Sequence, residues 1–230
     1  MTTELTDATE LDTAALAGRV VLLAGATSDA GREVTRAAQA AGGTVVATGR
    51  DEEKLAALAD ALPGVVTETV DLTDEAAVDA LVARVHDSVG PVDGVLHLVG
   101  GFRRGDGIPG QSDADWAALE TSLTALRHVS RAFYPDLVAS PAGRLAIVSS
   151  TSAQKPHRNT ANYSTVKAAS ETWTGAIASG FDADAPETAA AVIFAVSSLS
   201  GLEQELASRF VGLWSAEAAT LNASRHVLTA

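Results

Sequence analysis

Three polar residues in the second half of the sequence have the types and the spacing that acid-base chemistry requires. Tyr163 and Lys167 are four residues apart, which on a helix places both side chains on one face, one turn apart. An ammonium group beside a phenol favours the phenolate and lowers the tyrosine pKa. Ser150, thirteen residues before Tyr163, can then hold a carbonyl or alcohol oxygen while Tyr163 moves the proton. The same spacing also fits a packed tyrosine and a solvated lysine, so the choice between these two interpretations depends on the rest of the sequence.

The composition indicates a globular chain with few cationic side chains. Its 230 residues are 47% hydrophobic and 4% aromatic, which is enough apolar material for one large domain. A net charge of -13 disfavours nucleic acid and anionic membrane surfaces as partners, because both attract basic proteins. The absence of cysteine excludes disulfides and thiolate–metal sites, and we expect no metal centre. Residues 1–16 lack a signal-peptide pattern and no apolar run could cross a membrane, so we expect a cytoplasmic protein.

Short apolar runs alternate with helical patterns along the chain. The expected strands are 20–24, 44–48, 65–70, 92–99, 144–149, 189–195 and 226–228. Two of the expected helices end near residues 41 and 89. The others span residues 51–62, 113–139, 161–179 and 202–214. The first of these apolar runs is continuous rather than alternating, as in parallel strands that are buried on both faces. We expect a doubly wound parallel sheet of about seven strands in one α/β domain, residues 18–230, after a tail of residues 1–17.

The joint between the first strand and the first helix is rich in small residues. It contains Gly25 and Gly31, with the hydroxyl groups of Thr27 and Ser28 between them. At such a joint, backbone N–H groups and the helix dipole favour a bound pyrophosphate. Two glycines also suit an ordinary tight turn, but the position of this joint, first in an alternating α/β chain, favours a nucleotide site.

The ends of the second and third strands bear on the choice of nucleotide. Dinucleotide folds that use NAD place an acid at the end of the second strand, whereas this chain has Arg50. Arg50 can pair with a 2′-phosphate, which favours NADP(H) over NAD(H), or it can pair with Asp51 or Glu53 in a solvated turn. Asp71, followed by Leu72, can accept a hydrogen bond from an adenine amino group or cap the next helix.

With these features in place, residues 18–230 resemble the short-chain dehydrogenase/reductase family, whose fold is a Rossmann-type sheet. The most specific element is Ser150 followed by Tyr163 and Lys167 at the family spacing. The resemblance implies a carbonyl or alcohol substrate, with Tyr163 as general acid/base and Ser150 orienting the substrate oxygen. It implies that Lys167 lowers the Tyr163 pKa and holds the nicotinamide ribose. It also implies a homodimer or homotetramer formed through the helices 113–139 and 161–179.

The sequence departs from that family pattern at four places. Asp29 replaces the middle glycine of the first turn, His97-Leu98-Val99-Gly100 replaces Asn-Asn-Ala-Gly, Ser122 replaces an asparagine, and Val196-Ser197 replaces Pro-Gly before a short segment 198–201. Of the second motif only Gly100 survives, as a cofactor-binding candidate, and we expect His97 to be a packed strand residue. The family asparagine holds a water in a proton relay, and Ser122 would take its place with slower proton exchange.

The first departure, Asp29, concerns cofactor binding. The last, the short segment 198–201, concerns the lid that closes over the substrate. We expect the Asp29 carboxylate either to lie where a phosphate would approach and weaken cofactor binding, or to act as an acid at the start of the following helix. The short segment 198–201 predicts an open site, a bulky substrate, or a lid borrowed from residues 101–110. The alternative function is a non-catalytic or weakly active nucleotide-binding or scaffolding protein on the same fold.

Overall fold

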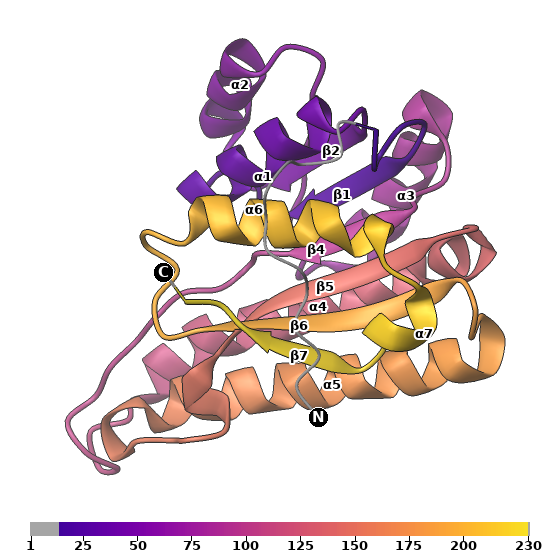
Figure 1. Ribbon diagram of the computed structural model, residues 1–230. Coiled ribbons are helices and arrows are strands. Elements are labelled where there is room, and N and C mark those ends of the chain that lie inside the picture. Colours follow the sequence, from indigo (N-terminus) through magenta and orange to yellow (C-terminus); the bar gives the residue numbers. More distant parts are fainter. Residues whose placement is uncertain (1–13, 230) are drawn as a thin grey trace.

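A computed structural model describes residues 14–229, which fold around one parallel sheet (Figure 1). The sheet has seven strands in the order β3-β2-β1-β4-β5-β6-β7, and every neighbouring pair is parallel. The strands are β1 Val20–Ala24, β2 Thr44–Gly49, β3 Val66–Thr69, β4 Gly94–His97, β5 Gly143–Ser150, β6 Ala189–Val196 and β7 Ser224–Val227. The chain order reverses direction between β1 and β4, as expected for a doubly wound Rossmann-type sheet.

Helices cover both faces of the sheet (Figure 1). They are α1 Asp29–Ala40, α2 Glu52–Ala61, α3 Glu75–Val89, α4 Asp113–Ala139, α5 Ala161–Asp184, α6 Glu203–Gly212 and α7 Ala218–Leu221. Short 3-10 turns occur at η1 Thr151–Ala153, η2 Arg158–Thr160 and η3 Leu213–Ser215. No helix in the described part of the chain combines the length and apolar character needed to cross a membrane.

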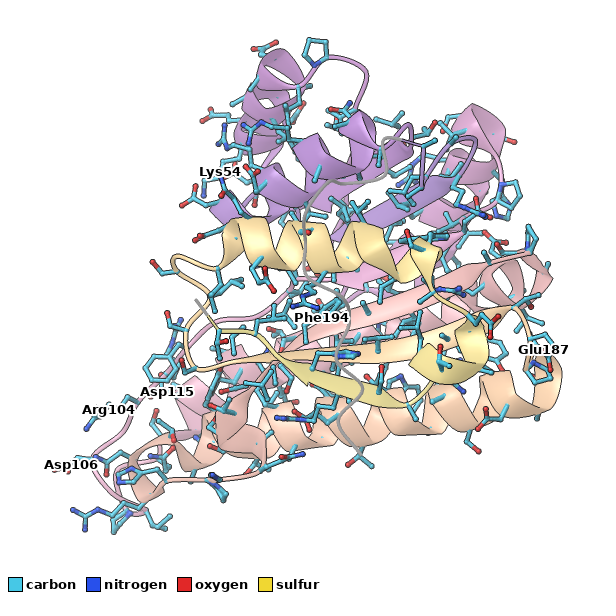
Figure 2. The ribbon with its side chains drawn as sticks, viewed as in Figure 1. Lys54, Arg104, Asp106, Asp115, Glu187 and Phe194 are labelled. Carbon is cyan, nitrogen blue, oxygen red and sulfur yellow. The ribbon has the colours of Figure 1, made fainter. Side chains whose placement is uncertain are left out.

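The strands supply two separate cores, because successive side chains of a strand point to opposite faces. Val21 and Leu23 of β1 belong to the core under α1, α2 and α6, whereas Val20 and Leu22 belong to the core under α3, α4 and α5. Phe194 of β6, labelled in Figure 2, is fully buried in the first of these cores. Burial on both faces explains why the strands read as continuous apolar runs.

Four helices begin with a side chain that accepts hydrogen bonds from the first turn. These N-cap residues are Ser28, Asp51, Asp74 and Ser112. Asp74, not Asp71, caps α3, so the alternative that Asp71 caps this helix is wrong. The reason is local, because the Asp71 carboxylate is already bonded to Thr73 in the turn before the helix.

Several predicted boundaries differ from the observed elements. The predicted strands 65–70 and 92–99 are shorter in the structure, because strand ends are set by pairing with neighbours and not by apolar content. The helix predicted over 161–179 continues to Asp184, and the one predicted over 202–214 is α6 followed by η3. The predicted tail lies mainly outside the described residues, and within 14–17 the side chain of Leu16 is fully buried.

A buried arginine ties the amino end of β5 to the C-terminal region. Arg144 is 3% exposed and donates to the backbone carbonyls of Gly143, Thr188, Leu213 and Ala216 at 2.8–3.0 Å. Burial lowers the Arg144 pKa to about 10. Its charge is therefore balanced by carbonyl dipoles, and these bonds hold the segment after α6 against the sheet.

Candidate active site

The three residues predicted to carry acid-base chemistry lie together at the carboxyl end of the sheet. Ser150 is the last residue of β5 and is 3% exposed, and Tyr163 and Lys167 occupy the first two turns of α5. The Ser150 Oγ accepts hydrogen bonds from the Ser152 backbone N–H at 3.1 Å and from the Ser152 hydroxyl at 3.0 Å. Both bonds use Ser150 as the acceptor, so its own hydroxyl hydrogen is available to a neighbouring oxygen.

Lys167 is partly buried near the carboxyl ends of β4 and β5. Its Nζ donates to the carbonyl oxygen of Val148 at 2.8 Å, and a Cβ built on Gly100 would lie 3.4 Å from this Nζ. The Nζ is 6.0 Å from the centroid of the Tyr163 ring. Burial lowers the Lys167 pKa to about 8, against the opposing effect of the Glu171 carboxylate. The ammonium group thus faces the gap between β4 and β5.

The expected decrease in the Tyr163 pKa is not observed. Burial raises the pKa of the phenol, and the side-chain hydrogen bond with Ser150 only partly opposes that effect. The Lys167 ammonium is bonded to Val148 and contributes no resolved effect on Tyr163. The sequence-based expectation considered one cation and left out the burial of the phenol, which dominates here.

A pocket of about 240 Å³ lies beside this group, at the carboxyl ends of β1 to β4. It is lined by Gly25, Thr27, Ser28, Gly49, Arg50, Val70, Asp71, Leu72, Thr73, Leu98, Val99, Gly100, Thr121 and Ala125. Most of the predicted cofactor-binding residues are therefore brought together. Tyr163 and Lys167 do not line this pocket, but Gly100 of its wall adjoins the Lys167 Nζ, so the pocket lies next to the Tyr163 site.

The two glycines of the first turn have different functions. Gly25 has φ +89, and an added Cβ would lie 3.0 Å from the Val99 side chain, so only glycine leaves this pocket wall open. Gly31 does not line the pocket, and an added Cβ would lie 2.2 Å from the Ala26 carbonyl oxygen. Gly31 therefore permits close packing of α1 on the turn, and its N–H is bonded to the Ser28 Oγ at 3.1 Å.

Arg50 and Asp71 both line the pocket. The Asp71 Oδ1 accepts from the Thr73 N–H at 2.9 Å and from the Thr73 hydroxyl at 2.7 Å. These two bonds and then the Arg50 charge lower the Asp71 pKa. The other acid nearby, Asp51, caps α2 and pairs with Lys54 at 3.2 Å. The predicted alternative in which Asp51 holds Arg50 is therefore not observed.

Asp29 lies outside this pocket. It is the first residue of α1 and is exposed. It lines a separate depression with Arg32, Glu33, Arg36, Gly201, Glu203 and Gln204, between α1 and the start of α6. Its effect on a bound phosphate stays a prediction.

His97 and Ser122 are joined where the family pattern places asparagines. The His97 Nε2 is 3.0 Å from the Ser122 carbonyl oxygen, while the Ser122 hydroxyl donates to Leu119 at 2.7 Å. Burial lowers the His97 pKa to about 3, and its Nδ1 is buried without a partner. His97 is thus a packed, neutral strand residue, as expected. The Ser122 hydroxyl is thus engaged within its own helix, and its contribution to a proton relay stays a prediction.

The connection after β4 contacts Tyr163. The Phe102 ring packs edge-on against the Tyr163 ring, with 5.1 Å between centroids. This loop runs beside the segment that leads into α5 (Figure 1), where Gly105 and Gly107 donate to Asn159 at 2.9 and 3.1 Å. Arg104, labelled in Figure 2, lies on the exposed outer side of the loop.

Sequence reasoning missed two charged residues behind the site, Glu171 and Arg225. Glu171 is four residues after Lys167, and Arg225 lies on β7. The spacing of Tyr163, Lys167 and Glu171 is a signal for one helix face. No sequence signal connects Arg225 to them, because that contact depends on strand order.

Within residues 14–229, no three His, Cys, Asp or Glu side chains lie close enough to hold a metal ion. Residues 19–185 match the family profile described as short chain dehydrogenase. The chain belongs to the short-chain dehydrogenase/reductase family. It is 31% identical over 156 residues to an uncharacterized oxidoreductase of Staphylococcus haemolyticus, covering 67% of this chain and 68% of that one. Over 165 residues it is 34% identical to L-xylulose reductase of Bos taurus, covering 71% and 66%.

Solved structures of this family share the fold over nearly the whole chain. The L-sorbose reductase of Gluconobacter frateurii, complexed with NADPH and L-sorbose, superposes with a TM-score of 0.82 at 20% identity, covering 94% of this chain and 97% of that one. A putative short chain dehydrogenase of Escherichia coli superposes with a TM-score of 0.85 at 21% identity, covering 95% and 98%. At this identity the likeness establishes the short-chain dehydrogenase/reductase fold, and the activity must be argued from the site.

Proposed function

We propose that the protein is an NADP(H)-dependent oxidoreductase that transfers a hydride between nicotinamide and a carbonyl or alcohol substrate. The observation that carries the proposal is the convergence of Ser150, Tyr163 and Lys167 beside the pocket at the carboxyl ends of β1 to β4. Family membership supports the reaction class.

The residues of the pocket fit a dinucleotide. The turn at Gly25 is open, and the hydroxyl groups of Thr27 and Ser28 line the wall at the N-terminus of α1, where a pyrophosphate is favoured. Asp71 and Leu72 would flank the adenine. When bound, the nicotinamide would supply or accept the hydride.

Arg50 supports NADP(H) over NAD(H). It lines the pocket, and no carboxylate in the described part of the chain lies within 4 Å of it as an ion-pair partner. The nearby acid that could repel a 2′-phosphate, Asp51, is held by Lys54 and the first turn of α2. Arg50 can therefore pair with a phosphate through two parallel hydrogen bonds. Several structural neighbours are complexes with NADP or NADPH.

Each reacting proton can be assigned to a side chain of this site. During reduction Tyr163 donates its phenolic proton to the substrate oxygen, and during oxidation it removes the proton from the alcohol. Ser150 donates its hydroxyl hydrogen to the same oxygen, in place of its bond with Tyr163, since its lone pairs accept from Ser152. Lys167 would hold the ribose of a bound nicotinamide cofactor, and its ammonium charge, 6.0 Å from the centroid of the Tyr163 ring, would favour the phenolate.

The alternative, a non-catalytic or weakly active nucleotide-binding protein, is favoured by one observation. In this structure Lys167 is bonded to Val148 and the Tyr163 pKa is raised, which is not the state required of a general base. Titrating the protein with NADPH and NADH while following nicotinamide fluorescence tests both functions. Lack of binding of either at high micromolar concentration would overturn the proposed enzyme.

If NADPH binds, its oxidation over a panel of ketones and aldehydes separates the two functions, with Tyr163→Phe as the control. We expect Tyr163→Phe to retain NADPH binding and to lose at least about a hundredfold in turnover. Activity that survives this substitution would contradict the assignment of Tyr163. NADPH binding without turnover of any compound would favour the alternative.

The groove between α4 and α5 supports the proposed homodimer or homotetramer. It has a volume of about 420 Å³ and is lined by Ser130, Arg131, Tyr134, Trp173, Ala176, Ile177 and Gly180. An apolar, aromatic groove on two long helices is typical of a surface that a second subunit covers. Sedimentation equilibrium would test this, and a strictly monomeric protein would contradict it. The cytoplasmic location stays a prediction.

A further inference from the structure

The side chain of Glu171 points from α5 toward the carboxyl end of β5, directly behind the candidate active site. It is 13% exposed and accepts a hydrogen bond from the Ser149 hydroxyl at 2.6 Å. Lys167 is one helical turn before Glu171 and Tyr163 is two turns before it. The carboxylate thus contacts the residue next to Ser150 and lies on the helix that carries Tyr163 and Lys167.

Arg225 completes this cluster from the edge strand of the sheet. Its guanidinium binds Glu171 with two nitrogens, Nε to Oε2 at 3.1 Å and Nη2 to Oε1 at 3.2 Å. The same Nη2 donates to the backbone carbonyl of Ser150 at 3.2 Å. Arg225 is aligned with Ile193 of β6, so its side chain reaches past that strand to the end of β5. The arginine therefore contacts the backbone of Ser150 itself.

The location of this pair argues against a purely stabilising function. Burying two charges costs solvation free energy that a pair of apolar side chains would not incur, so buried ion pairs often contribute little net stability. This pair contacts both residues at the end of β5, Ser149 and Ser150. Its position therefore matters for where the Ser150 hydroxyl lies and for the charge near Lys167.

We propose that Glu171 and Arg225 are positioning residues, which fix the end of β5 that carries Ser150 and hold a carboxylate one helical turn from Lys167. The catalytic consequence rests on the proposed oxidoreductase function. The charge effect on Lys167 does not, because it exists in the protein without cofactor or substrate.

The groups that face Lys167 come from three elements. Val148 of β5 accepts its hydrogen bond, Tyr163 and Glu171 lie on its own helix, and His97 of β4 interacts with its charge. His97 is neutral because burial lowers its pKa to about 3. Glu171 is therefore the anion that acts on Lys167, and Arg225 holds that anion in place.

The composition of the chain allows a direct test. It contains three lysines, Lys54, Lys155 and Lys167, so lysine labelled with ¹³C at Cε gives three NMR signals that a Lys167→Arg variant assigns. We expect the Lys167 pKa to fall by about one pH unit or more in Glu171→Gln, because the opposing carboxylate is gone. Glu205→Gln is the matched control, since it removes a carboxylate paired with Arg209 on α6. It should leave the Lys167 pKa unchanged.

An unchanged Lys167 pKa in Glu171→Gln would overturn the inference, whether or not the enzyme reduces ketones. If Glu171→Gln does not fold, the double variant Glu171→Met with Arg225→Met removes both charges together and leaves none unpaired. It should show a smaller fall in the Lys167 pKa, because loss of the Arg225 cation partly offsets loss of the carboxylate on the same helix as Lys167, and an unchanged or raised value would overturn the inference.

The positioning of Ser150 has a separate readout. Once a substrate is found, Arg225→Met should lower kcat about tenfold or more with little change in the KM for NADPH, since the cofactor pocket is not touched. Arg225→Lys restores the charge but not the two-nitrogen geometry, and should recover only part of the loss. Equal kcat in Arg225→Met and the unmodified enzyme would contradict the positioning of Ser150.

Discussion

The ring of Phe102 meets the ring of Tyr163 edge-on at 5.1 Å, although the two residues are 61 positions apart in the sequence. This contact shields the candidate catalytic phenol from water, and burial is the main cause of its raised pKa. The connection after β4 therefore acts on Tyr163 in the way that a substrate lid acts in related folds.

Replacing Phe102 should change the ionisation of Tyr163. We expect Phe102→Ala to lower the Tyr163 pKa toward its ordinary value of about 10, because the phenol becomes more accessible to water. The chain has two tyrosines, and the pKa of the other, Tyr134, is raised to about 12, so their ionisations can be separated by ultraviolet titration. Ile108→Ala, which trims another exposed apolar residue of the same loop, is the control. An identical Tyr163 titration in Phe102→Ala and the unmodified protein would refute the shielding.

Arg50 should govern the choice between the two nicotinamide cofactors. We expect Arg50→Ala to weaken NADPH binding about tenfold or more and to change NADH binding little, because only NADPH carries the 2′-phosphate. Fluorescence titration measures both dissociation constants. Arg84→Ala is the matched control, since Arg84 is an exposed arginine that pairs with Glu68 and does not line the pocket. Equal weakening of both cofactors by Arg50→Ala would contradict the assignment.

His97 should make the folded protein less stable in mild acid. Its pKa is about 3 when folded and 6.5 in an unfolded chain, so below pH 6.5 only the unfolded state gains this proton. The stability that His97 contributes is complete above pH 6.5 and is lost as the pH falls toward 3, by about 1.4 kcal/mol per pH unit. Urea unfolding of the unmodified protein and of His97→Gln from pH 7 to pH 4 measures this effect. The other titrating groups are present in both proteins, so the pH dependence of the difference in unfolding free energy comes from His97. A constant difference in unfolding free energy across that range would show that the prediction is wrong.

Arg144 should contribute more to stability than an exposed arginine. Arg144→Met leaves the carbonyls of Thr188, Leu213 and Ala216 without their donor, so we expect a loss of about 2–4 kcal/mol. For a chain of this size that corresponds to a decrease in Tm of roughly 5–15 °C. Arg36→Ala, which removes an exposed arginine paired with Glu33, should change stability by less than about 1 kcal/mol. Similar melting temperatures for the two variants would contradict the structural importance of Arg144.

The fold was predictable because its signals are local. Continuous apolar runs such as Val20–Ala24 identify strands buried on both faces, and Gly25 marks a turn whose positive φ only glycine adopts easily. The proximity of Ser150 to Tyr163 and Lys167 was predictable for a related reason. Ser150 ends a predicted strand, and Tyr163 and Lys167 lie at the start of the predicted helix that follows it.

The parts that sequence reasoning missed depend on distant contacts. The contact of Phe102 with Tyr163 follows from the path of a loop, and the contact of Arg225 with Ser150 follows from the place of β7 next to β6. The Tyr163 pKa was misjudged because a charge four residues away is visible in a sequence, whereas the burial of a phenol is not. Glu171 was within reach, because it continues the helical spacing of Tyr163 and Lys167.

The contact between Arg225 and the Ser150 carbonyl has a consequence for how the protein is made. A ribosome synthesises Ser150, Tyr163 and Lys167 long before it reaches the strand that carries Arg225. A nascent chain that has been made only as far as β6 thus lacks the arginine that contacts the Ser150 carbonyl. This contact can form only after β7 has been made and has paired with β6 at the edge of the sheet.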